Sequence, residues 1–399
     1  MTDICLIFEL HQPFRLRKDF FWGKRLFKGG DNLFEHYFDI DLDRKIFQKV
    51  SAKCYHPANE AILELIDNFD GEFKVAYSIS GVFVEQCRLF DEDLIESFRS
   101  LTGTGAVELL DQTYYHSLSG LYEDEDEFVD QVRMHQGLMK DLFKSTPEVF
   151  ENTELIYNER IAKLAEKLGY RGIVAEGADR VLKGRSPNHI YIPQNGNIRV
   201  ILRNYRLTDD IGFRFSSRNW EEYPLTADKY ASWLAATPGD CITIFPDYET
   251  FGEHHWRDTG IFEFLRALPE EVLKWEQMGF VTPSEAIKKH EPAGRLEVGL
   301  WDTTSWADIE RTTSSWIGNT MQWACYSYHK DLKGLVRGEK RKIWRYLGES
   351  DHLYYMFMQG GSAGEVHNYF SHFASPYDAF ITYFSALLDL GARVEGVIE

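Results

Sequence analysis

The chain has 399 residues, of which 44% are hydrophobic and 15% are aromatic, and its formal net charge is −19. So acidic a chain repels phosphate backbones, which argues against nucleic acid as a partner. The length exceeds one ordinary domain of roughly 100–200 residues and suits a barrel with an accessory domain. The high aromatic share fits stacking on sugar rings and the packing of a large core equally well.

The cysteines and the N-terminal segment indicate a cytoplasmic protein. The five cysteines are Cys5, Cys54, Cys87, Cys241 and Cys325. They are widely spaced without a CxxC motif, so neither a zinc ribbon nor a disulfide framework is indicated. The first apolar stretch carries Glu9 and His11 and lacks a basic flank, so we expect a strand there and not a signal peptide. No run approaches the ~18 apolar residues of a membrane helix, so we expect no membrane partner.

Short apolar runs alternate along the chain with longer segments of helical periodicity. The runs expected as strands are 4–10, 73–80, 106–111, 148–154, 172–177, 198–204, 241–249 and, more weakly, 279–285. The helical segments between them include 57–69, 92–101, 126–143, 159–170 and 261–279. This alternation predicts an α/β fold with a parallel sheet and helices outside it. Seven or eight such units in roughly 290 residues predict a closed or nearly closed β/α barrel.

The pattern changes near residue 300. Residues 307–332, 338–359 and 374–391 are helix-periodic with aromatic residues on one face, and no alternation with strands remains. We therefore expect two domains: a barrel over residues 1–295, and a helical domain over 296–399 that packs on the barrel and completes its cleft.

Polar residues recur at the points where the apolar runs stop. These residues are His11, Asp111 with His116 shortly after it, Glu154, Glu176, Asp247 and Glu249. Active sites of β/α barrels lie at the carboxyl ends of the strands, so this recurrence predicts a site at that end of the barrel.

Asp247 and Glu249 are candidate catalytic acids. They end the run CITIFPDYE (241–249), and alternate residues of a strand face the same side, so both can share one pocket. Two close carboxylates raise the pKa of one of them, which a general acid needs. The alternative is that the two acids cap the helix that follows.

Glu154 is a further candidate acid. It lies in FENTELIYNE (150–159), where Asn152 and Thr153 can donate hydrogen bonds that keep a carboxylate ionised. A glycosidase needs such an ionised acid beside its general acid. The alternative is a structural acid at a helix start, because Thr or Asn followed by Glu is typical of helix N-termini.

Five other residues are candidate contacts for a sugar. They are His11, Tyr115, His116, Trp220 and Trp306. The two histidines follow strands of one predicted barrel, where each could bind sugar hydroxyls or a metal. The three aromatic residues could stack on sugar rings, and core packing explains each of them at least as well.

Five motifs resemble, in order, the five sequence regions of glycoside hydrolase family 57. They are ELHQP (9–13), GAVELLDQTYYHSL (105–118), FENTELIYNE (150–159), FPDYETFGEH (245–254) and VTPSE (281–285). Further segments resemble the α-amylase branch of that family: AEGADRVLKGRSPNHIY (175–191), TTSWADIERTTSSWIGN (303–319), SDHLYYM (350–356) and GEVHNYFSHFASPYDAF (364–380). The chain departs from this branch after YYM, where FMQGGSAGEVH (357–367) replaces an expected lysine-bearing segment.

The resemblance implies an incomplete barrel of seven βα units followed by a helical domain, and cleavage or transfer at α-glucosidic bonds with retention. It implies that Glu154 is the nucleophile and Asp247 the acid/base. It also implies that the glucan cleft is lined by His11, His116, Glu249 and Trp220. We expect neither a cofactor nor a metal, and an α-glucan such as starch, glycogen or maltodextrin as the partner.

The favoured hypothesis is therefore a retaining α-1,4-glucan hydrolase of the α-amylase type. A 4-α-glucanotransferase uses the same intermediate, with a sugar hydroxyl in place of water, and no motif separates the two. A metal-dependent deacetylase or mannosidase on a related barrel would place His11, Asp247 and another histidine around zinc, but the chain lacks a compact HxxxH pair. A non-catalytic glycogen-binding protein would not need both acids.

Overall fold

A computed structural model describes residues 2–23, 32–358 and 371–397 of the chain. Within these residues, eight parallel strands form one sheet. The strands are β1 (Thr2–Leu10), β2 (Val75–Ile79), β3 (Val107–Leu110), β4 (Val149–Glu151), β5 (Gly172–Glu176), β7 (Arg199–Arg203), β8 (Cys241–Ile244) and β9 (Met278–Phe280). A small second sheet pairs β6 (Ile192–Pro193) with β10 (Arg295–Leu296).

Seven of these strands form a barrel. Around the ring they follow the order β1, β2, β3, β4, β5, β7 and β8, which is their order in the sequence. β3 and β4 meet at a parallel bridge between Asp111 and Phe150, where the Asp111 N–H donates to Val149 and the Glu151 N–H donates to Asp111. β9 pairs with the first residues of β1, and β2 pairs with the last residues of β1 on the same edge of that strand. The predicted β/α barrel is therefore confirmed.

Burial on both faces explains why the strands read as continuous apolar runs. In β1, Cys5 and Ile7 belong to a core inside the barrel, whereas Ile4, Leu6 and Phe8 belong to the core between the strands and the helices. Successive side chains of a strand alternate between faces, so a parallel strand with helices outside it needs apolar residues at every position.

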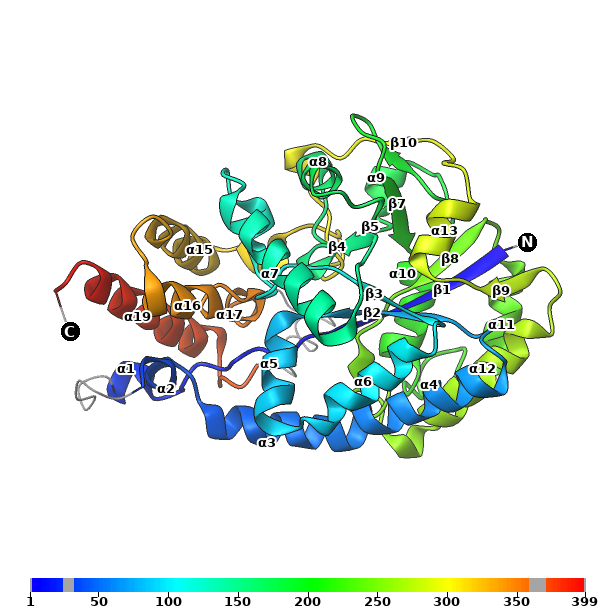
Figure 1. Cartoon of the computed structure of the whole chain (residues 1–399), viewed down its shortest axis with the longest axis horizontal. Helices are drawn as coiled ribbons and strands as arrows, with labels where there is room; N and C mark the ends of the chain where they lie inside the picture. The colour runs from blue at the N-terminus through cyan, green and yellow to red at the C-terminus, as the bar shows by residue number, and fades with distance from the viewer. Residues whose placement is uncertain (1, 24–31, 359–370, 398–399) are drawn as a thin grey trace.

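Helices surround the barrel and continue beyond it (Figure 1). Those between or directly after the strands are α1 (Phe20–Gly23), α2 (Leu33–Tyr37), α3 (Ile40–Val50), α4 (His56–Asn68), α5 (Gly81–Phe90), α6 (Asp93–Gly103), α7 (Asp126–Phe143), α8 (Glu159–Lys167), α9 (Asp179–Leu182), α10 (Tyr205–Asp209), α11 (Ala227–Ala236), α12 (Ile261–Leu273) and α13 (Pro283–Lys289). The later helices are α14 (Ser314–Ile317), α15 (Thr320–Leu332), α16 (Gly338–Tyr346), α17 (Ser350–Tyr354) and α19 (Pro376–Val394).

The predicted helical region after the barrel is confirmed. In Figure 1, α15, α16, α17 and α19 gather at the end of the molecule opposite the N-terminus, where α19 also lies beside α1. The proposed domain boundary between residues 295 and 296 stays a prediction. Most of the departing segment 357–367 lies outside the described residues. In the described part of the chain, no helix combines the length and apolar character needed to cross a membrane.

The structure corrects the strand boundaries next to the predicted acids. β4 ends at Glu151 and β8 at Ile244, so the expected strands 148–154 and 241–249 were too long. Pro246 has no N–H to donate to a neighbouring strand, which explains why regular pairing of β8 ends before it. Asp247 and Glu249 therefore do not share a pocket through strand alternation. They lie at and within a 3₁₀ turn, Tyr248–Thr250.

The last predicted strand and helix also differ from the structure. α12 ends at Leu273, six residues before the expected end at 279. β9 stops at Phe280, and the remainder of the expected strand 279–285 begins α13. A capping box between Thr282 and Glu285, followed by a proline at the first helical turn, starts this helix.

Candidate active site

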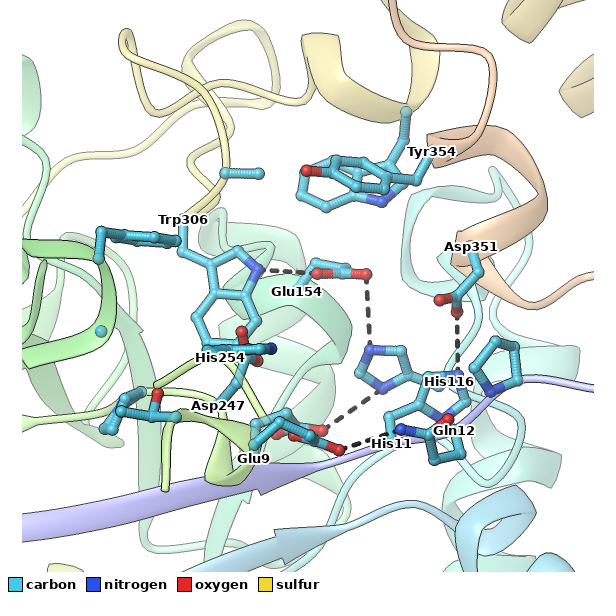
Figure 2. Close-up of a pocket in the computed structure, with 18 of the residues that line it drawn as sticks. Glu9, His11, Gln12, His116, Glu154, Asp247, His254, Trp306, Asp351 and Tyr354 are labelled. Atoms are coloured by element: carbon cyan, nitrogen blue, oxygen red, sulfur yellow. Dashed lines mark hydrogen bonds and ion pairs between the residues drawn. The ribbon is translucent and has the colours of Figure 1, made fainter. Parts of the chain in front are cut away.

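A cavity lies where the carboxyl ends of the strands meet the segments that follow the barrel (Figure 2). Its lining includes His11, His116, Glu154, Arg203, Asp247 and Glu249 from the barrel, and Trp306, Asp351 and Tyr354 from the later segments. Six of the eight candidate residues thus come together, from four strand ends and one segment after the barrel. These six are Glu154, Asp247, His11, His116, Glu249 and Trp306.

Tyr115 and Trp220 are not among the described residues that line the cavity. Tyr115 is buried, with its ring edge-on to Tyr346 at 5.1 Å and beneath the guanidinium of Arg345. Trp220 is half-buried and packs against Trp233 of α11, with ring centroids 6.1 Å apart. Both residues make the packing contacts that the core-packing alternative expects, and their role as sugar contacts stays a prediction.

Glu154 lies in a tight turn after β4, and its side chain points into the cavity (Figure 2). Its φ is +62° and that of Leu155 is +51°, a left-handed conformation that such residues rarely adopt. Oε2 accepts a hydrogen bond from Trp306 Nε1 at 2.7 Å, and Oε1 accepts one from Ser350 Oγ at 2.7 Å. His116 Nε2 lies 3.6 Å from Oε1. Donors therefore surround this carboxylate and stabilise its negative charge.

Unlike Glu154, which hydrogen-bond donors surround, Asp247 is buried close to other carboxylates. Burial and the nearby carboxylates of Glu249 and Glu154 raise the pKa of Asp247 to about 8, although Arg203 and His116 oppose this shift. Asp247 is therefore largely protonated at neutral pH, which is the state of a general acid. Two acids at one cavity, one held by hydrogen-bond donors and the other with a raised pKa, can divide the roles of nucleophile and acid.

His11 and His116 stack on one another, with ring centroids 4.1 Å apart. Burial, and then the charge of His116, lowers the pKa of His11 to about 4. A neutral His11 fits its contacts, because Nε2 can donate to Asp351 at 3.0 Å while Nδ1 accepts from Ser80 Oγ at 2.7 Å. Burial opposes the charged form of His116, but Glu154, Glu151 and Asp351 together outweigh burial and raise the pKa of His116. The stack thus pairs a neutral ring with a ring that favours its charged form.

A buried polar network contacts His116 through its Nδ1 atom. Gln112 accepts from His116 Nδ1 at 2.8 Å, and its amide donates to Glu9 at 3.0 Å and to Ser78 at 2.8 Å. Ser78 in turn donates to Glu151 at 3.1 Å. Burial, and then Glu151, raises the pKa of Glu9 well above its usual range. The network holds the His116 ring through Nδ1 and leaves Nε2 facing Glu154.

Glu249 and Arg203 are two further ionisable residues that line the cavity. Glu249 accepts from the Tyr55 hydroxyl and from Gln12 Nε2, and burial raises the pKa of Glu249 to about 7. Arg203 is 4% exposed and donates to Glu176, Asp209 and the Phe245 carbonyl at 2.8–2.9 Å. A buried guanidinium with several partners is rigid, so it supplies a fixed positive charge near Asp247.

The family model for glycosyl hydrolase family 57 matches residues 5–299, which include every strand end described above. The chain belongs to glycosyl hydrolase family 57. Membership makes it a glycoside hydrolase, and the resemblance inferred from the motifs is confirmed.

Family 57 relatives differ widely in their similarity to this chain. A Methanocaldococcus jannaschii protein named "Putative alpha-amylase" is 49% identical over 398 residues, which cover 97% of this chain and 83% of that protein. An alpha-amylase of Pyrococcus horikoshii is 21% identical over 79% of this chain and 48% of its own length. A 4-alpha-glucanotransferase of Thermococcus litoralis is 22% identical over 62% of this chain and 37% of its own length.

Solved family 57 structures share the fold. A branching enzyme of Thermococcus kodakaraensis matches with a TM-score of 0.68 at 13% identity, over 98% of this chain and 90% of that one. The Thermococcus litoralis 4-alpha-glucanotransferase matches with a TM-score of 0.61 at 17% identity, over 98% of this chain and 60% of that one. At these identities the likeness supports the nearly closed barrel with its helical region, and not an activity.

Sequence reasoning missed Arg203, Asp351 and Tyr354 as cavity residues. Arg203 stands near the end of the predicted strand 198–204, so the strand-end rule that selected Glu154 could also have found it. Asp351 and Tyr354 lie on α17, in the helical region after the barrel. No local pattern indicates which face of α17 meets the barrel, so only the tertiary structure places them.

Proposed function

We propose that this chain hydrolyses α-1,4-glucosidic bonds of starch, glycogen or maltodextrins with retention of configuration. The observation that carries the proposal is the pair of acids at one cavity, with Glu154 among donors and the pKa of Asp247 raised to about 8. A carboxylate and a carboxylic acid at one site are what a retaining glycosidase needs. The relatives named as alpha-amylases support an α-glucan as the substrate.

The first step transfers a glycosyl group to Glu154. A carboxylate oxygen of Glu154 attacks the anomeric carbon while Asp247 gives its proton to the glycosidic oxygen, so that the C–O bond breaks and the leaving sugar departs as an alcohol. A glycosyl ester on Glu154 and an ionised Asp247 remain.

The second step releases the sugar. Asp247 takes a proton from water, the water oxygen attacks the same carbon, and the ester bond to Glu154 breaks. His11, His116, Glu249 and Asp351 would bind sugar hydroxyls around this carbon, and Trp306 with Tyr354 would supply aromatic walls.

Incubation with maltoheptaose and with glycogen tests hydrolysis against the second candidate, a 4-α-glucanotransferase, which a relative's name suggests. We expect shorter maltodextrins and a rising number of reducing ends, measured by chromatography and a reducing-sugar assay. Chains longer than maltoheptaose at a constant number of reducing ends would instead establish transfer to a sugar hydroxyl.

Retention gives a separate prediction about stereochemistry. Two displacements at one carbon restore the α configuration, so proton NMR of a fresh hydrolysate should show the α-anomer first, with the β-anomer appearing as mutarotation proceeds. Early β-anomer would indicate direct attack by water and would remove Glu154 from the nucleophile role.

Activity is expected to need no metal. Within the described part of the chain, His11, Glu349 and Asp351 offer ligand atoms that lie within 4.8 Å of one another. Burial, and then Asp351, raises the pKa of Glu349 well above its usual range, and a protonated acid is a poor ligand. Dialysis against a chelator should therefore leave turnover of maltodextrin unchanged. A loss that zinc reverses would favour the deacetylase or mannosidase alternative.

A further inference from the structure

Segments that follow the barrel hold both oxygens of the Glu154 carboxylate. Trp306 Nε1 donates to Oε2 and Ser350 Oγ donates to Oε1, each at 2.7 Å. The ring of His116, which follows β3 in the barrel, lies further away, at 3.6 Å from Oε1. Figure 2 shows the Trp306 indole nitrogen directed at Glu154 from outside the barrel.

Backbone pairing sets the position of Trp306. The segment that follows β10 runs antiparallel to the turn that carries Glu154, with reciprocal hydrogen bonds between Tyr157 and Thr304 of 2.9 and 3.0 Å. At the end of this pairing, the Trp306 N–H donates to the Glu154 carbonyl at 3.3 Å. The residues that carry the indole and the carboxylate therefore lie in two backbone segments that are hydrogen-bonded to each other.

The Trp306 ring is fixed by its surroundings as well. Phe245 packs against it with ring centroids 5.8 Å apart, and the buried guanidinium of Arg203 lies 5.8 Å from its centre. Arg311 donates to the Trp306 carbonyl and also to Asp209, at 3.0 Å. A side chain enclosed in this way loses little further entropy when it makes a hydrogen bond.

A second pairing positions Ser350. Glu349 forms an antiparallel bridge with Ser117, and the Ser350 N–H donates to the His116 carbonyl at 2.9 Å. Ser350 is fully buried at the start of α17. This backbone hydrogen bond to His116 therefore fixes the position from which the Ser350 hydroxyl donates to Glu154.

We propose that Trp306 and Ser350 are positioning residues that fix the plane of the Glu154 carboxylate for attack on the anomeric carbon. This inference rests on the proposed function. A glutamate side chain on a turn has three rotatable bonds, and two fixed donors on opposite oxygens restrict all of them. Trp306 then acts through Glu154 and not chiefly as a stacking surface for sugar. The two donors closest to the Glu154 carboxylate both come from segments that follow the barrel.

The decisive variant is Trp306→Phe, which keeps an aromatic ring against Phe245 and removes the N–H. We expect kcat to fall roughly 10- to 100-fold with KM nearly unchanged, because a hydrogen bond to a charged group is lost. Trp233→Phe, on α11 outside the cavity, is the matched control and should behave like the wild type.

Ser350→Ala removes one oxygen atom and tests the second donor if Trp306→Phe folds poorly. We expect the same pattern, a fall in kcat with an unchanged KM. A rise in KM with unchanged kcat in Trp306→Phe would make Trp306 a sugar-stacking residue and would overturn the inference. Wild-type kcat in both variants would overturn it too.

A measurement without substrate separates this inference from the proposed function. In the wild type labelled with ¹⁵N-indole tryptophan, the signal that disappears in Trp306→Phe identifies the Trp306 N–H. We expect this signal to lie downfield and to move upfield in Glu154→Gln, where the acceptor loses its charge. An unmoved signal contradicts the inference even if α-glucans are hydrolysed. If no α-glucan is hydrolysed, the proposed function fails while this signal still tests the contact.

Discussion

Glu154→Gln should abolish nearly all hydrolysis of maltodextrin, with a loss on the order of 10³-fold or more, equivalent to about 4 kcal/mol of activation free energy. The amide has the shape of the carboxylate but carries no charge, so it cannot form the glycosyl ester. Trp306 and Ser350 can still donate to its oxygen or lie beside it, so the fold should be retained. Initial rates together with a thermal unfolding curve measure both expectations.

Glu159→Gln is the matched control for this change. Glu159 lies five residues further along, in the first turn of α8, where its carboxylate accepts from Asn195 at 2.8 Å. It does not line the cavity, so we expect an activity close to that of the wild type. If Glu154→Gln kept wild-type turnover while remaining folded, another residue would have to be the nucleophile.

Asp247→Asn should cause the second large loss, again on the order of 10³-fold for natural glucans, whose leaving groups need a proton. The loss should be much smaller for a maltosyl fluoride, because fluoride departs without protonation. Asp247 must be protonated in the first step, so kcat/KM of the wild type should fall as pH rises through about 8, the raised pKa of Asp247. This basic limb should be absent from the variant.

Azide distinguishes the two acids by the configuration of the product. In Asp247→Ala, azide can attack the glycosyl ester without a general base, and this second displacement should give the α-glycosyl azide. In Glu154→Ala, azide would take the place of the nucleophile and give the β-azide. Asp240→Asn, at the opposite end of β8, should leave rates unchanged. A β-azide from Asp247→Ala would reverse the assignment of the two roles.

The barrel followed from the sequence because strands and helices have local periods. Runs such as 4–10 and 172–177 are apolar at every position, which is a consequence of burial on both faces in a parallel sheet. The segment 126–143 coincides with α7 at both ends. The boundaries near the acids were less accurate, since Pro246 follows shortly after the end of β8, and a turn with the left-handed residues Glu154 and Leu155 follows β4.

The catalytic candidates followed from a different property of the sequence. Polar residues placed where apolar runs stop select Glu154, Asp247 and His11, and family motifs give them roles, so several residues of the barrel mouth could be predicted. Tyr115 and Trp220 show the limit of this reasoning, because an aromatic residue has the same local signature in a core and at a sugar site.

The sequence by itself determined the barrel, the helical region after it and the acids at the strand ends, because each depends on neighbouring residues. Only the tertiary structure decided what surrounds those acids. The donors to Glu154 are separated from it by 152 and 196 residues, and no periodicity relates positions so far apart. The raised pKa of Asp247 likewise depends on burial and on charges from other segments. These quantities arise from packing in three dimensions, so they become defined only when the chain has folded.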